Sequence, residues 1–114
     1  MKYQPKNTIE LEVLLSDESI YLGDIDTSLI TDMSCLFAND IGAKCPNRKD
    51  FSGISNWDVS NVENMDRMLE YCRSFNQPLD RWDAKRLKTA IDMFNGCKAI
   101  TFQSNVAKAQ KYDI

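Results

Sequence analysis

The chain of 114 residues contains no histidine. Histidine is the usual general base near neutral pH, so its absence removes every Ser-His or Cys-His arrangement for nucleophilic catalysis. No two of the four cysteines form the C-x-x-C pair that a structural zinc site would need. We therefore predict no enzymatic activity, no cofactor and no metal site.

Long apolar runs are missing too. No stretch approaches the ~20 apolar residues of a membrane span. The start, Met1 to Lys6, lacks the apolar centre of a secretory signal, so we expect a cytoplasmic protein without membrane insertion. The length, with 43% hydrophobic and 27% charged residues, is typical of one soluble folded domain.

The net charge of −3 argues against general nucleic-acid binding. It is unevenly distributed: residues 1–50 carry five basic and nine acidic side chains, and residues 51–114 carry nine basic and eight acidic ones. Residues 81–98 have a local charge of +3, from five basic and two acidic side chains. This stretch is either an ordinary solvated face or a patch for an acidic partner.

An internal repeat is the main signal. Residues 57–72 read WDVSNVENMDRMLEYC, and residues 82–97 read WDAKRLKTAIDMFNGC, in register at an offset of 25. An earlier copy begins at Asp26 at an offset of 32, which places an insertion within residues 39–49. A matched tryptophan, aspartate, cysteine and apolar pattern is not expected by chance.

Each copy has two periodicities. Apolar residues spaced by three and four predict helices over residues 61–71 and 86–95, the first started by a Ser60–Glu63 capping box and the second ended by Gly96. Short extended segments are predicted at Ile54–Trp57 and Leu79–Trp82. Such units bury their faces only by stacking, with strands paired in parallel.

The sequence therefore predicts an α/β fold: a short leucine-rich-repeat-like solenoid of about three strand–helix repeats of about 25 residues. Residues 1–22 form an N-terminal cap, in which Thr8 begins a helix over residues 9–15. Three repeats follow at residues 23–50, 51–74 and 75–99, and residues 100–114 are a C-terminal cap or tail.

The sequences WDVSNVENM, FNQPLDRWD and DMFNGCK, with the opening YQPK…EL…L…DESIYLGDIDTS, resemble the BspA-like leucine-rich-repeat surface proteins of bacteria over roughly residues 3–99. The resemblance implies protein binding, often adhesion at a cell surface, without enzymatic activity. This chain has about two and a half repeats, and its third reads Asp83-Ala-Lys-Arg-Leu87. It looks like a short relative adapted to one partner, as an inhibitor or adaptor.

Two residue pairs have alternative interpretations. Trp57 and Trp82 are either binding hot spots, where tryptophan is enriched, or a structural ladder at the aromatic position of the repeat. Asp58 and Asp83 are expected to hold the turn after each strand by accepting backbone N–H bonds. A carboxylate pair for acid–base catalysis is the weaker alternative.

The sulfur-containing residues are predicted to be mainly core. Cys72 and Cys97 occupy equivalent places and should be reduced, buried neighbours, whereas Cys45 is the cysteine expected to be exposed and reactive. A core stripe is favoured over a groove for a partner helix at Met33, Met65, Met68 and Met93.

Polar residues flanking the predicted strands form the candidate binding surface, because that side of a repeat protein often faces partners. With the two tryptophans, the predicted partner-binding set is Asn56, Trp57, Arg81, Trp82, Lys85, Arg86 and Lys88. The leading hypothesis is a protein-interaction module. Self-assembly, suggested by Phe102 and a weak C-terminal cap, and nucleic-acid binding through the basic third repeat are the alternatives.

Overall fold

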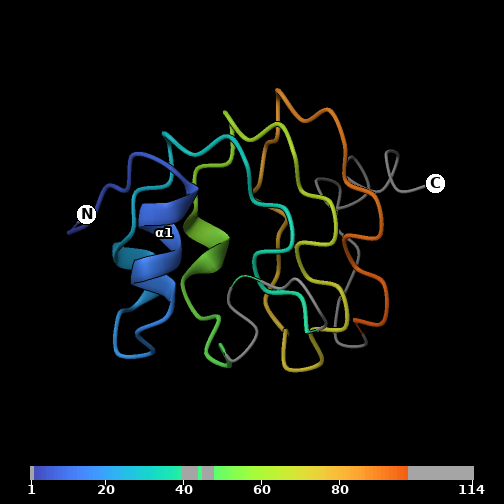
Figure 1. Ribbon diagram of the computed structural model, residues 1–114, viewed down its shortest axis with the longest axis horizontal. Coiled ribbons are helices and arrows are strands. Elements are labelled where there is room, and N and C mark those ends of the chain that lie inside the picture. The colour runs from blue at the N-terminus through green and yellow to red at the C-terminus, as the bar shows by residue number, and fades with distance from the viewer. Residues whose placement is uncertain (1, 40–43, 45–47, 98–114) are drawn as a thin grey trace.

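The computed structural model describes residues 2–39, 44 and 48–97. Among these residues, helical structure is confined to the α-helix α1 over Thr8–Leu15 and two 3-10 helices, η1 over Leu22–Asp24 and η2 over Ile54–Asn56. The rest of the described chain consists of turns and extended segments that lie side by side, from α1 at one end to the third repeat at the other (Figure 1).

The predicted N-terminal helix is confirmed, and its starting residue is corrected. Asn7 is the N-cap: its Oδ1 accepts the backbone N–H of Glu10 at 2.9 Å, so one of the free amides of the first turn is satisfied. Thr8 lies inside α1, and its hydroxyl donates to the Asp32 carbonyl at 2.7 Å. Leu11 and Leu15 are buried, so α1 attaches to the first repeat through one face and this bond.

Backbone hydrogen bonds between neighbouring repeats hold the turns together. The N–H groups of Met33, Cys35, Phe37 and Asn39 donate to carbonyls 31 residues further on, at 2.8–2.9 Å. The N–H groups of Met65, Arg67, Leu69 and Tyr71 donate to carbonyls 24 residues further on, at 2.7–3.0 Å. Isolated parallel bridges join Asp32 to Asn64 and Asn64 to Thr89, at the same separations of 32 and 25 that relate the repeats in the sequence.

The predicted strand–helix repeat solenoid is wrong. Among the described residues there is one α-helix, the paired positions are isolated bridges, and no sheet forms. Residues 61–71 and 86–95 are turns and short extended segments where helices were predicted. Residues 54–56 form η2 instead of a strand, and the Trp82 N–H closes a turn onto the Leu79 carbonyl at 3.1 Å.

Backbone conformation explains why no helix forms in the repeats. Cys35, Arg67 and Asp92, at equivalent positions, have φ values of 57°, 57° and 56°. This left-handed conformation interrupts an α-helix, and the N–H groups used between repeats cannot also bond four residues back. The predicted capping box is absent too, since the Ser60 hydroxyl donates to Asp58 and Glu63 pairs with Lys88.

The core consists of equivalent apolar side chains stacked from repeat to repeat. All four methionines predicted as a core stripe are at most 1% exposed, which confirms that prediction. Phe51 packs edge-on against Phe37 and Phe75, at ring-centroid distances of 5.1 and 5.4 Å. An apolar spacing of three and four thus fills the core from successive turns as well as it would from a helix.

Several predictions fall outside the described residues. These are the exposed Cys45, most of the inserted segment within residues 39–49, and the C-terminal cap or tail with Phe102, which motivated the self-assembly hypothesis.

Candidate functional site

The two tryptophans lie in the core. Trp57 and Trp82 are 3% and 4% exposed. Their Nε1–H groups donate to the carbonyls of Leu22, at 2.9 Å, in η1 at the end of the N-terminal cap, and of Ile54, at 3.0 Å, in the preceding repeat. This is the geometry of a structural ladder, built from hydrogen bonds to the previous turn, and it leaves little of either ring for a partner to contact.

The aspartate that follows each tryptophan belongs to a turn. Asp58 Oδ1 accepts the N–H of Ser60 at 3.0 Å and its hydroxyl at 2.6 Å, as predicted for a turn-holding carboxylate. These two bonds lower the pKa of Asp58, and Lys85 adds to the effect, whereas burial and the neighbouring Asp26 carboxylate oppose it. Asp83 accepts the Lys85 N–H through its backbone carbonyl at 3.0 Å.

The polar members of the predicted surface are all exposed, and the structure pairs some of them. Arg81 Nη1 donates to Asn56 Oδ1 of the preceding repeat at 3.1 Å. Lys88 Nζ lies 3.0 Å from Glu63 Oε1, also one repeat earlier.

Lys85 and Arg86 differ from these two side chains. Neither forms a side-chain hydrogen bond or ion pair with any residue that the structure describes. They are therefore the cations of this surface that are most open to an external anion, and Lys85 also acts on the Asp58 carboxyl, whose pKa it lowers.

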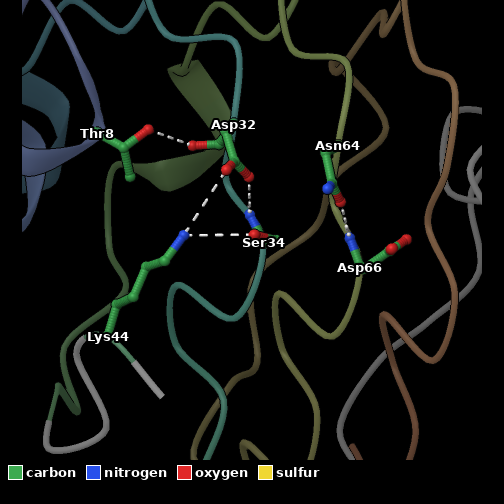
Figure 2. A network of polar contacts seen from close by, with 6 residues as sticks. All are labelled: Thr8, Asp32, Ser34, Lys44, Asn64 and Asp66. Carbon is green, nitrogen blue, oxygen red and sulfur yellow. Dashed lines mark hydrogen bonds and ion pairs between the residues drawn. The ribbon is translucent and has the colours of Figure 1, made fainter. Parts of the chain in front are cut away.

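A second polar row runs beside the core at the paired positions (Figure 2). Asp32 Oδ1 accepts the N–H of Ser34, and Asn64 Oδ1 accepts the N–H of Asp66, both at 2.8 Å. Lys44 Nζ lies 3.3 Å from the Ser34 hydroxyl and 3.9 Å from Asp32 Oδ2.

The third repeat has Thr89 where the earlier repeats have an Asx residue, and the Thr89 hydroxyl donates a hydrogen bond to Asp66 instead of accepting the N–H two residues on. Asp66 replaces the missing acceptor: its Oδ1 accepts the Ile91 N–H at 2.8 Å and the Thr89 hydroxyl at 2.6 Å. Sequence reasoning missed this row, although the aligned Asp32, Asn64 and Thr89, each directly before a core residue, were its signal.

Two of the cysteines that the structure describes, Cys72 and Cys97, behave as core residues. Cys35, Cys72 and Cys97 are free thiols, and the latter two are buried. The Cys97 thiol approaches the Cys72 carbonyl at 3.4 Å, which confirms the predicted neighbouring buried thiols. Burial raises the pKa of Cys72, against opposing hydrogen bonds to Ser74 and Phe75, so this thiol is poorly suited to act as a nucleophile.

Within the described ranges, no group of three or more His, Cys, Asp or Glu side chains could hold a metal ion. No helix found there combines the length and apolarity that a membrane crossing requires.

The fold defines a repeat protein whose irregular turns are stacked by backbone hydrogen bonds, with exposed polar side chains at their edges. Residues 12–113 match the model of a family described as "Mycoplasma protein of unknown function, DUF285", and the chain belongs to this family. No curated protein and no solved structure matches the chain.

Proposed function

We propose that this chain is a non-enzymatic protein-interaction module that binds an acidic surface of a partner through the exposed cations of its third repeat. The observation that carries the proposal is the exposure of Lys85 and Arg86. Their side chains form no hydrogen bond or ion pair with a residue that the structure describes. The neighbouring Arg81 is bonded to Asn56, and Lys88 is paired with Glu63. The two unpaired cations therefore lie beside two side chains whose positions are fixed.

The fixed positions of Arg81 and Lys88 have a physical consequence for binding. Arg81 and Lys88 lose less conformational entropy on contact with a partner than mobile side chains would, whereas Lys85 and Arg86 supply the charge. Unpaired cations attract an acidic partner and raise its association rate. The resemblance to BspA-like proteins supports protein binding as the role, and an inhibitor or adaptor of one partner is the form we favour.

Catalysis has no place in this proposal. The chain lacks histidine, and the Asp58 carboxylate is engaged in its turn through the N–H and hydroxyl of Ser60.

The test is a capture experiment from lysate of the source organism, with the tagged full chain as bait and nuclease treatment to remove nucleic acid. The bait is compared with Lys85→Ala/Arg86→Ala and with the control Lys6→Ala/Lys49→Ala, which removes two exposed cations elsewhere. We expect one protein to bind the wild type and the control, and to bind Lys85→Ala/Arg86→Ala about tenfold more weakly. Equal capture by all three baits, or capture that nuclease abolishes, would contradict the proposal.

A further inference from the structure

The N-terminal segment presents an open backbone edge. Tyr3 forms a parallel bridge with Ile25: its N–H donates to the Asp24 carbonyl at 3.1 Å, and its carbonyl accepts the Asp26 N–H at 2.7 Å. Alternate backbone groups of an extended chain point to opposite sides, so those of Gln4 point away from this neighbour. The Gln4 N–H and C=O form no hydrogen bond with any described residue, and Gln4 is exposed.

A shallow, open groove with both apolar and charged residues lies beside this edge. It has a volume of about 410 Å³, and its apolar walls are Tyr3 and Pro5 from the N-terminal segment and Val13 and Leu14 from α1. Val13 is 67% exposed, although α1 already buries Leu11 and Leu15 on its other side. A helix with apolar side chains on both sides is normally covered on both, so the groove side of α1 lacks a cover.

The charges at the groove select the occupant. Lys2 is compensated by Asp24 at 3.6 Å. Glu10 is exposed, and its Oε1 accepts the backbone N–H of Lys6 at 2.9 Å, a group without charge. Glu10 forms no ion pair with a described residue. A cation is therefore favoured beside Glu10.

From these observations we infer that the edge at Gln4 and the groove beside α1 bind an extended segment of a partner protein by strand addition. The segment forms hydrogen bonds with the Gln4 N–H and C=O, packs one apolar side chain against the exposed Val13, and places a basic side chain beside Glu10. The next N–H on the outer side, that of Lys6, already donates to Glu10 Oε1 at 2.9 Å, so the pairing ends there and a short segment suffices.

This inference deepens the proposed function, because it adds a second protein-binding site to the interaction module. The two proposals fail separately: Lys85→Ala/Arg86→Ala is expected to leave the groove intact.

The experiment is an NMR titration of the ¹⁵N-labelled full chain with two capped hexapeptides, one alternating leucine and lysine and the other alternating leucine and glutamate. We expect saturable shifts of the Gln4, Glu10 and Val13 amides with the lysine peptide, and binding of the glutamate peptide at least about fivefold weaker. Lys85→Ala/Arg86→Ala should bind the lysine peptide like the wild type. Absence of saturable shifts at these amides would overturn the inference.

Matched variants separate the edge from the charge. Gln4→Pro removes the N–H, whereas Gln4→Ala keeps it and removes only the side-chain bond to Asp26. We expect Gln4→Pro to weaken binding of the lysine peptide about tenfold and Gln4→Ala to weaken it less than about twofold. Glu10→Gln should abolish the preference for lysine over glutamate.

If Gln4→Pro disturbs folding, which the indole N–H signals of Trp57 and Trp82 would reveal, Val13→Lys blocks the groove from an exposed position and should abolish binding. Equal binding by Gln4→Pro and Gln4→Ala in folded proteins would overturn the inference. So would a concentration-dependent mass of the chain that Gln4→Pro removes, because the occupant would then be a second copy.

Discussion

At the residue scale, a buried arginine joins the N-terminal region to the end of the first repeat. Arg48 is 4% exposed, and its guanidinium donates to four carbonyls at 2.7–3.3 Å: those of Leu15, Asp17, Ile20 and Asp50. Leu15 ends α1, where the helix dipole favours a cation. Nothing in the sequence pattern marks this residue, because three of its four partners are backbone carbonyls about 30 positions away.

We therefore expect Arg48→Met to lower the free energy of unfolding by about 3 kcal/mol, because it leaves buried carbonyls without donors. Arg86→Met, at an exposed position, is the control and should change it by less than about 0.5 kcal/mol. Urea unfolding followed by tryptophan fluorescence measures both. A loss for Arg48→Met as small as that of the control would show that the carbonyl bonds contribute little.

The turn-holding aspartates give stability a dependence on pH. Asp26 and Asp58 accept bonds from Ser28 and Ser60, and these bonds lower the pKa of each carboxyl from 3.8. Since the folded pKa lies below the unfolded one, the contribution to stability is present above about pH 5, and it is lost as pH falls through 3.8 and then through the lower folded value.

Urea midpoints measured at a series of pH values between 6 and 2 test this expectation. The wild type should lose stability on acidification, and Ser60→Ala, which removes the largest cause of the Asp58 shift, should lose less between the same pH values. An identical pH dependence of the two proteins would argue against the role of the serine bond.

At the element scale, the sequence predicted which residues face the core but not the conformation that places them there. The register of the repeats, the methionine stripe and the N-terminal helix could all be read from apolar positions and capping residues. The two repeat helices could not be excluded, because side chains three and four apart also face inward from a chain of tight turns. The left-handed φ at Arg67 and the backbone hydrogen bonds to the next repeat exclude a helix here. Both features depend on the stacking of one repeat on another.

Substitution at Arg67 distinguishes the two conformations by sign. At φ 57° glycine is unstrained, so Arg67→Gly should be more stable than Arg67→Ala by about 1 kcal/mol. In an α-helix the order would be reversed by a similar amount. Thermal or urea unfolding of the two variants decides, and a more stable Arg67→Ala would restore the helix that the apolar spacing suggested.

At the scale of the whole molecule, the stack separates two kinds of surface. Its N-terminal end carries α1 with the open edge at Gln4, and its third repeat carries Lys85 and Arg86. The basic third repeat could be predicted from the uneven distribution of charge along the sequence. Because Trp57 and Trp82 are buried, only the polar residues of the predicted partner-binding set remain candidates. The groove could not be predicted, since it forms only when residues 2–5 lie beside α1.

Both surfaces depend on the stacking of the chain, in which backbone hydrogen bonds join neighbouring repeats. Through-hydrogen-bond scalar couplings between amide ¹⁵N and carbonyl ¹³C nuclei report each donor–acceptor pair directly. We expect Met65 to couple to Thr89, Arg67 to Ile91 and Leu69 to Met93, each across 24 residues. Couplings from these amides to carbonyls four residues earlier would instead show helices in the repeats, and would contradict the stacked-turn structure on which both proposals depend.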